Sequence, residues 1–400
     1  MNRPALSTRD RRALAAVAAQ FFVNGAMTAS FIARAPQIRD RIGVTVDRFG
    51  LLLTLAGLFG LVGSLLAGRI IHRFGSRRVL IAGAFVMVPV LPIIGLARSA
   101  AVYLLAMMAY VLLDVLVDIS MNLQGSWLSA RRHTPVMHRL HGLWSLGAFA
   151  GGVGAAVANA VGASLLVHLG VVAAVAALLL LVVSRGLLRV DEDGHEDTRG
   201  QPVAVPTGGR ARLVPLALLA VGGLTAVAVE VTGGDWAAFR LADDLGTSAA
   251  LASAAFVAYT VGMAALRFGG DFLQLRLGRD GLHRWSVAAA TVGLVLASLV
   301  SNPWASIAGF TLIGAGVATF LPKLYDDAAR LPGRRGAGLG AMTAGTRVAV
   351  MTTPVLVGAI AGTSWSVGDA IAIVTLPSVV AYVAVTELNA RMLRRRAAKF

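Results

Sequence analysis

The chain has 400 residues, of which 57% are hydrophobic and only 14% are charged. This is too little polar surface to cover a water-soluble globule of that size, so we expect lipid to cover most of it. The sequence contains no cysteine, which excludes disulfide bonds, thiol chemistry and thiolate metal sites.

The formal net charge of +16 would fit nucleic acid binding, but the positions of the basic residues argue against it. With the N-terminus in the cytoplasm, 29 of the 36 lysines and arginines fall in segments on the inner side of the predicted membrane. We therefore interpret the charge as a topology signal and a contact with anionic lipid. It places both termini in the cytoplasm, and the Ala-, Gly-, Val- and Arg-rich composition indicates the inner membrane of a bacterium.

Long uncharged runs recur about a dozen times, and many reach the roughly 17 to 25 residues that a helix needs to cross the hydrocarbon core. Their continuous apolarity favours helices over the alternating pattern of a barrel. The first run exceeds the apolar stretch of a signal peptide, so we expect it to be retained. The prediction is an all-α integral membrane protein with helices near residues 13–33, 49–67, 79–97, 101–128, 137–160, 165–184, 213–236, 249–268, 285–301, 305–322, 337–361 and 369–388.

One long polar stretch, rich in acids, proline and glycine, divides these helices into two halves of six. Both halves carry an arginine-x-glycine turn after their second helix, around Gly75 and Gly278. The expected segments are a cytoplasmic N-terminus at 1–12, a first six-helix bundle at 13–184, a linker at 185–212, a second bundle at 213–388 and a basic cytoplasmic tail at 389–400.

The fourth helix contains two acids and an amide on one face, because Asp114, Asp118 and Asn122 are spaced by four residues. Ionisable groups inside a membrane are costly and usually mark a pathway, a pair or a proton site. Two carboxylates one turn apart repel each other, which makes one of them a plausible proton carrier. The alternative is that each bonds a neighbouring polar group and serves only to pack helices.

Three charged residues within predicted helices of the second half are singled out. Glu230 in the seventh helix is our candidate there for binding protons or substrate, with a structural ion pair as the alternative. Asp235 is expected at the membrane interface, since Trp236 beside it is typical of a boundary anchor. Arg347 in the eleventh helix needs a partner, which an acid or an anionic substrate would supply.

Two histidines, His138 and His141, flank the start of the fifth helix, where they could shuttle protons or simply contact solvent or lipid headgroups. Four further residues are candidates to line a solute cavity, because amides and aromatic rings suit a hydroxylated or aromatic solute. For each aromatic residue, core packing is the alternative. These four are Asn24, Gln124, Trp144 and Tyr259.

The segment from Gly68 to Arg78 resembles the loop signature G-x-L-x-D-R-x-G-R-R of the major facilitator superfamily of secondary transporters. A weaker copy runs from Gly270 to Arg279. Three further segments resemble uncharacterised bacterial permeases related to the fucose-permease type: residues 33–39, 118–122 and 141–147. The resemblance covers essentially the whole chain and implies two pseudo-symmetric bundles that rock about a central site.

Two departures from the family pattern bear on mechanism. The acid of the loop signature is His72 here, and its counterpart in the second half is Leu275, so a latch that depends on that carboxylate is in question. The fifth helix also lacks the glycine-proline motif of many drug:proton antiporters, which argues against multidrug efflux.

The signature loops also have a mechanical interpretation, in which their arginines face helix C-terminal carbonyls and acids and hold one side closed. Inward-positive topology alone would also explain them. The residues concerned are Gly68, Arg73, Gly75, Arg77 and Arg78 in the first loop, and Asp271, Arg276 and Gly278 in the second.

These features predict a secondary transporter that moves a small organic solute, coupled to protons and using no cofactor, and we expect a monomer. A transport-inactive sensor or scaffold on the same fold is the alternative. No G-x-x-x-x-G-K-[ST], H-E-x-x-H or G-x-S-x-G motif occurs, which disfavours an ATP-driven pump and an enzyme. Uptake or export, and the identity of the solute, stay open.

Overall fold

The computed structural model describes residues 7–132, 136–189, 210–329 and 335–397, and within these ranges the chain is helical with no strand. Within the described residues, twelve helices are long and apolar enough to cross a membrane, which confirms the predicted number. These spans are Thr8–Ile32, Val46–Phe74, Ser76–Leu96, Ala100–Arg131, Arg139–Ala160, Leu165–Gly186, Leu213–Asp235, Ala249–Gly270, Phe272–Leu299, Pro303–Tyr325, Gly338–Ala361 and Val367–Met392.

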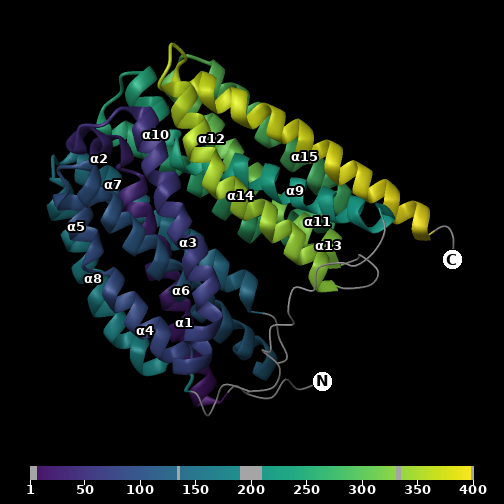
Figure 1. The fold of residues 1–400 in the computed structure, drawn as a ribbon, viewed down its shortest axis with the longest axis horizontal. Helices are drawn as coiled ribbons and strands as arrows, with labels where there is room; N and C mark the ends of the chain where they lie inside the picture. The colour runs from purple at the N-terminus through teal and green to yellow at the C-terminus, as the bar shows by residue number, and fades with distance from the viewer. Residues whose placement is uncertain (1–6, 133–135, 190–209, 330–334, 398–400) are drawn as a thin grey trace. The chain divides into compact units, whose positions relative to one another are not determined.

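Figure 1 shows the course of the helices. Those before the linker are α1 (Thr8–Ile32), α2 (Ala35–Ile42), α3 (Val46–Phe74), α4 (Ser76–Met87), α5 (Val90–Leu96), α6 (Ala100–Arg132), α7 (Met137–Ala160) and α8 (Leu165–Gly186). Those after it are α9 (Arg210–Asp235), α10 (Ala237–Phe239), the π-helix η1 (Arg240–Asp244), α11 (Ala249–Leu299), α12 (Pro303–Val317), α13 (Phe320–Ala329), α14 (Arg335–Ala361) and α15 (Val367–Ala397).

Polar side chains define several helix starts. Ser164 caps α8 by accepting a hydrogen bond from the amide of Val167. Asn302 caps α12 by accepting from the amides of Trp304 and Ala305, and Pro303 occupies the first helical position, where a missing N–H costs nothing.

The helices differ from the predicted ranges mainly at their charged ends. The segment predicted as a loop at 269–284 is almost entirely helical, because α11 is interrupted only at Gly278, whose φ is 70°. Hydropathy falls where a helix leaves lipid, but backbone hydrogen bonding continues there, so the predicted range was too short. Conversely, the predicted third helix is interrupted between α4 and α5, where Pro89 offers no N–H.

The chain forms two compact units. Unit 1 comprises Met1–Val44, Leu55–Glu196 and Ala249–Val257, and unit 2 comprises Thr45–Thr54, Asp197–Ser248 and Ala258–Phe400. The first residues of α3 and of α11 therefore each cluster with a unit other than the one that holds the rest of that helix.

In unit 1, α1 packs most extensively on α7, and the approach depends on glycine. A Cβ atom on Gly147 would collide with the carbonyl of Phe22, and one on Gly151 with the carbonyl of Ala26. Small residues let helix backbones approach closely in lipid, where hydrophobicity gives no drive for association.

In unit 2, α9 and α14 pack in a comparable way. A Cβ atom on Gly345 would collide with the carbonyl of Ala220, and one on Gly223 with the carbonyl of Met342. The long α15 runs along both helices (Figure 1). Close backbone packing thus fixes one helix pair in each unit.

Candidate functional site

Three candidates from three different helices form one hydrogen-bonded chain in unit 1. The indole nitrogen of Trp144 on α7 donates to Oδ1 of Asn24 on α1 at 2.8 Å. The amide nitrogen of Asn24 donates in turn to Oδ1 of Asp114 on α6, also at 2.8 Å. Asn24 is buried, and Asp114 and Trp144 are half-buried.

The donor-only indole of Trp144 sets the direction of this chain. Because it can only donate, the amide oxygen of Asn24 must face it, and the amide NH₂ must then face Asp114. Asp114 is therefore an acceptor in this structure. The orientation of an acid on one helix thus depends on side chains from two others.

A second polar contact lies one turn away along the same two helices. The hydroxyls of Thr28 on α1 and Tyr110 on α6 are 2.9 Å apart, and the Tyr110 ring meets Phe31 edge-on. Thr28 follows Asn24 by four residues and Tyr110 precedes Asp114 by four, as expected for antiparallel helices. The side chains of Tyr110 and Phe31 are buried, so apolar rings cover this end of the site.

Asp118 and Asn122 do not share the surroundings of Asp114. Asn122 donates to the Oδ1 of Asp118 at 3.0 Å and to its backbone carbonyl at 2.8 Å, within the same helix. The Asp118 side chain is exposed, whereas Asp114 is half-buried. The expected pair of carboxylates in one dry site is therefore not present, since each acid has its own amide partner.

Of two other first-half candidates, Gln124 has a packing role and His141 contacts an aromatic ring. Gln124 is fully buried, where it donates to the Ser76 hydroxyl at 2.8 Å and accepts from the amide of Leu188 at 3.0 Å, so the expectation that it lines a cavity was wrong. His141 is exposed and meets the ring of Phe21 edge-on at 5.3 Å. The side chain of His138 lies outside the described residues.

In unit 2, Glu230 lies opposite a cation that the sequence analysis did not single out. A guanidinium nitrogen of Arg267 on α11 is 3.7 Å from Oε1 of Glu230, and both side chains are half-buried. The hydroxyl of Tyr259 donates to the backbone carbonyl of Glu230 at 2.9 Å. Tyr259 is itself buried, so it positions α9 against α11 and does not line a cavity.

Trp236 is not the interfacial anchor that its position beside Asp235 indicated. Its side chain is completely buried and packs against the ring of Phe239, with centroids 5.1 Å apart. The chain folds back after α9 through α10 and η1, and this covers the indole. Sequence position alone could not show this fold-back.

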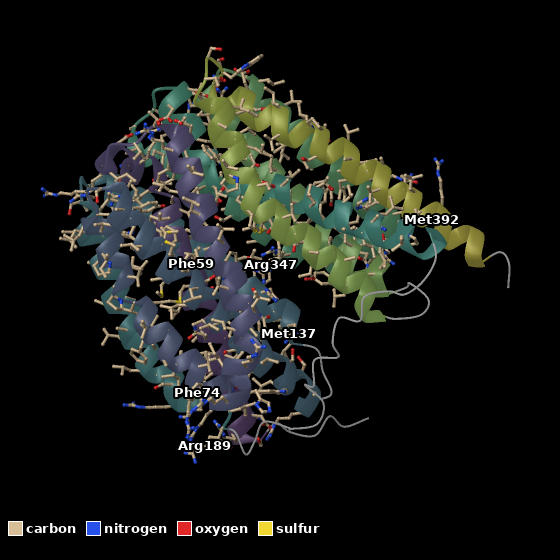
Figure 2. The ribbon with its side chains drawn as sticks, viewed as in Figure 1. Phe59, Phe74, Met137, Arg189, Arg347 and Met392 are labelled. Atoms are coloured by element: carbon tan, nitrogen blue, oxygen red, sulfur yellow. The ribbon has the colours of Figure 1, made fainter. Side chains whose placement is uncertain are left out.

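Arg347 lies within α14, inside the span Gly338–Ala361, and Figure 2 marks its place. The side chain is half-buried and has no hydrogen bond or ion pair with another described residue. The partner expected from the sequence is therefore not provided by the described part of this chain.

The first signature loop makes a sharp turn between α3 and α4. Gly75 has a φ of 78°, which favours glycine. Arg77 donates to the carbonyl of Ser184 in the last turn of α8 at 2.9 Å, where a cation is favourable. Arg73 and Arg78 are exposed, and a Cβ atom on Gly68 would meet no atom within 4 Å.

The second signature loop repeats the glycine turn at Gly278, whose φ is 70°. Arg276 is exposed and lies over the Phe272 ring at 4.3 Å. Arg279 is 3.8 Å from Asp327 on α13, which also accepts from Lys323 at 2.6 Å. The side chain of Asp271, the acid expected to meet the arginines, lies outside the described residues.

Comparisons with known proteins agree with this architecture. Residues 16–232, more than half of the chain, match the model of the Major Facilitator Superfamily. The chain belongs to this superfamily. The resemblance of the loop signatures is therefore confirmed at the level of the family, and solute transport is the function that membership supports.

Two curated relatives match most of the chain. The uncharacterized transporter y4wD of Sinorhizobium fredii is 29% identical over 317 residues, which are 78% of this chain and 81% of that protein. The membrane protein MosC of Rhizobium meliloti is 26% identical over 327 residues, or 80% and 76% of the two chains.

The crystal structure of the nucleoside transporter NupG has the same fold, with a TM-score of 0.69 over 95% of this chain and 99% of that one. The two sequences are only 12% identical, so the similarity concerns the superfamily fold alone.

The sequence analysis missed two buried arginines that follow the first helix of each half. Arg34 after α1 donates to Gln37 at 2.6 Å and to the carbonyl of Ala163 at 3.0 Å, which ties α1 to the start of α8. Burial lowers the pKa of Arg34 to about 10, so the guanidinium still carries its charge at neutral pH. The predicted first helix ends at residue 33, so the sequence analysis placed Arg34 in the loop that follows.

Arg240 after α9 is buried as well, but it has an acid partner. It donates to Asp244 at 2.7 Å and to the carbonyls of Ala297 and Val300. Asp244 also accepts from the amide of Gly368 at the start of α15 at 2.7 Å. A four-residue spacing of opposite charges was the available signal.

No group of three or more potential metal ligands occurs among the described residues. The hydrogen-bonded chain of Trp144, Asn24 and Asp114 is therefore the arrangement with the clearest chemistry in unit 1. It can hold or release a proton at a carboxylate whose neighbours are neutral.

Proposed function

We propose that the protein is a secondary transporter that moves a small organic solute by alternating access, coupled to protons, and that Asp114 is its proton site. Membership of the superfamily and the transporter relative y4wD support transport. The observation that carries the proton proposal is the chain from Trp144 through Asn24 to Asp114.

The chain links protonation to helix packing. The acceptor that Asn24 contacts is one carboxylate oxygen of Asp114. If the proton occupied that oxygen, a hydroxyl donor would face an amide donor, so the contact would weaken or rearrange. Because α1, α6 and α7 meet at these residues, a change of protonation would alter the balance between two arrangements of these helices.

The same proposal includes the setting of the protein. We place it in the bacterial inner membrane with both termini in the cytoplasm, where the basic segments contact anionic lipid. It works as a monomer in this proposal, since each unit holds its own candidate residues.

The direct test is proton movement in proteoliposomes. The full-length protein is reconstituted with the pH-sensitive dye pyranine inside, and solutes are added outside one class at a time, with nucleosides included because NupG is named for them. We expect a solute-dependent change of internal pH that Asp114→Asn abolishes. Asp40→Asn is the matched control, since Asp40 is an exposed acid that contacts Arg39. Solute uptake that proceeds without proton movement would contradict the coupling.

A second test needs no known solute. The fluorescence of Trp144 should depend on the charge at Asp114 two hydrogen bonds away, so a pH titration of the detergent-purified protein should show a component that both Asp114→Asn and Trp144→Phe remove. A titration that persists in Asp114→Asn would exclude this acid as its source. Solute binding without flux would favour a sensor on the same fold.

A further inference from the structure

Arg347 is the feature of unit 2 that the proton site leaves unexplained. It lies within a membrane span, and none of its nitrogens belongs to the buried unpaired atoms, so its guanidinium is accessible. Among the described residues it has neither an ion pair nor a hydrogen bond. Arg267, another half-buried arginine in a span of this unit, lies opposite Glu230.

The side chain projects from the face of α14 opposite the one that packs on α9. That packed face includes Met342, Gly345 and Ala349, and Arg347 follows Gly345 by two residues, which is a rotation of about 200° around the helix. Arg347 is thus directed away from α9.

Farther along α14, protein covers the stripe of residues that project in the same direction as Arg347. Pro354 and Gly358 follow Arg347 by seven and eleven residues and share its direction. Both lie against Gly50, which belongs to unit 2, because a Cβ atom on Gly50 would collide with the carbonyl of Pro354 and come within 3.1 Å of the Cα of Gly358. The stripe therefore faces protein at these positions, and lipid is not the expected environment of Arg347.

A cation in this setting needs a negative partner from outside the chain. A guanidinium presents a planar fork of N–H donors that matches a carboxylate or a phosphate with two parallel hydrogen bonds. The charge is also permanent, so it would attract an anion at any physiological pH.

We propose that Arg347 binds the oxyanion group, carboxylate or phosphate, of a small organic solute. The inference rests on the proposed transport function and names the chemical class of its solute. Glu230 does not compete with a solute anion for Arg347, since Glu230 already faces Arg267.

The first experiment measures whether oxyanions shield Arg347 from the arginine-selective reagent phenylglyoxal. The detergent-purified full-length protein is modified in the presence of benzoate, glucuronate or inorganic phosphate, and in parallel with the uncharged benzamide and glucuronamide. Mass spectrometry then measures modification at Arg347 and at the exposed Arg284, which serves as the control.

We expect Arg347 to react, and at least one oxyanion to slow that reaction while its uncharged counterpart and the Arg284 reaction stay unaffected. Protection by the carboxylates or by phosphate identifies which oxyanion fits. An unreactive Arg347, or equal reaction with all five compounds, would overturn the proposal.

Variants separate this inference from the transport proposal. Arg347→Gln should raise the concentration of the protecting oxyanion that is needed for thermal stabilisation roughly ten- to a hundredfold. The increase should be smaller for Arg347→Lys, because lysine keeps the charge but lacks the planar fork of donors. If Arg347→Gln still moves protons with an uncharged solute, the oxyanion proposal fails and transport stands. If oxyanions protect Arg347 but no solute moves protons, coupling fails and the binding site stands.

Discussion

The two units surround their intramembrane acids differently. In unit 1, Asp114 accepts a hydrogen bond from a neutral amide, and no cation pairs with it among the described residues. In unit 2, Glu230 lies opposite Arg267, and a second arginine, Arg347, has no acid partner there. Adding a proton to Asp114 would remove a charge that faces a neutral amide, whereas adding one to Glu230 would remove a negative charge that faces Arg267. This difference is the reason for proposing proton exchange in unit 1 and anion binding in unit 2.

Neutralising each acid in turn tests the difference between the two units most directly. Asp114→Asn should abolish solute-dependent proton movement in proteoliposomes. Glu230→Gln should retain it with weaker solute binding, because Arg267 then no longer faces an acid and can compete with Arg347 for the solute anion. The internal pH signal from pyranine measures both. If Glu230→Gln abolishes proton movement and Asp114→Asn does not, the roles of the two units are reversed.

The helix ends offer a second comparison between the units. Arg240 and Asp244 form a buried ion pair that ties η1 to α11 and α15, whereas the described partners of Arg34 are neutral groups. Arg240→Gln should lower stability by about 3–5 kcal/mol, because it leaves Asp244 buried without its cation. Arg34→Gln should cost about 1–3 kcal/mol, since only hydrogen bonds are lost.

Thermal denaturation in detergent checks this order, with the exposed Arg98→Gln as a control that should leave the midpoint unchanged. The double variant Arg240→Gln with Asp244→Asn should cost less than the sum of its parts, because neither charge is then left alone. A larger loss of stability for Arg34→Gln than for Arg240→Gln would show that the acid partner does not determine the size of the effect.

The sequence predicted the fold well because apolar runs and the distribution of arginine respond directly to a membrane. Within the site, it identified Asp114, Asn24 and Trp144 separately, since an acid, an amide and an indole in a span each need a partner. It could not show that they contact one another, because Asp114 and Trp144 follow Asn24 by 90 and 120 residues and the contact depends on tertiary packing.

The failures have a common physical cause. Trp236 and Gln124 are polar-tipped side chains that tertiary packing buries completely, and a single sequence carries no signal for that. Arg267 was not singled out because it lies at the end of the predicted helix, where the apolar run stops although the helix continues. Hydropathy marks where lipid ends, and it does not mark where a helix ends.

Glycine packing gives a prediction of intermediate size that tests whether both units rely on close backbone contact. Gly147→Ala in unit 1 and Gly345→Ala in unit 2 should each destabilise by about 1–3 kcal/mol, because the added methyl group meets a backbone carbonyl that cannot yield easily. Thermal denaturation in detergent measures the loss. Gly68→Ala is the control, since its methyl group meets no atom and alanine favours a helix by roughly 0.5–1 kcal/mol. A stability loss in Gly68→Ala equal to the other two would contradict the packing argument.

The smallest expected effect comes from Trp144, and it tests whether this residue sets the orientation of Asn24 in unit 1. Trp144→Phe removes the donor that fixes the Asn24 amide, so the amide oxygen becomes free to face Asp114. The protonated acid then gains an acceptor, and the midpoint of the pH profile of proton movement should move upward by less than about one pH unit. Trp285→Phe, at an exposed position in unit 2, should leave the midpoint unchanged. A downward movement, or an equal movement in both variants, would mean that Trp144 does not act through the orientation of Asn24, and the proton site would then consist of Asn24 and Asp114 alone.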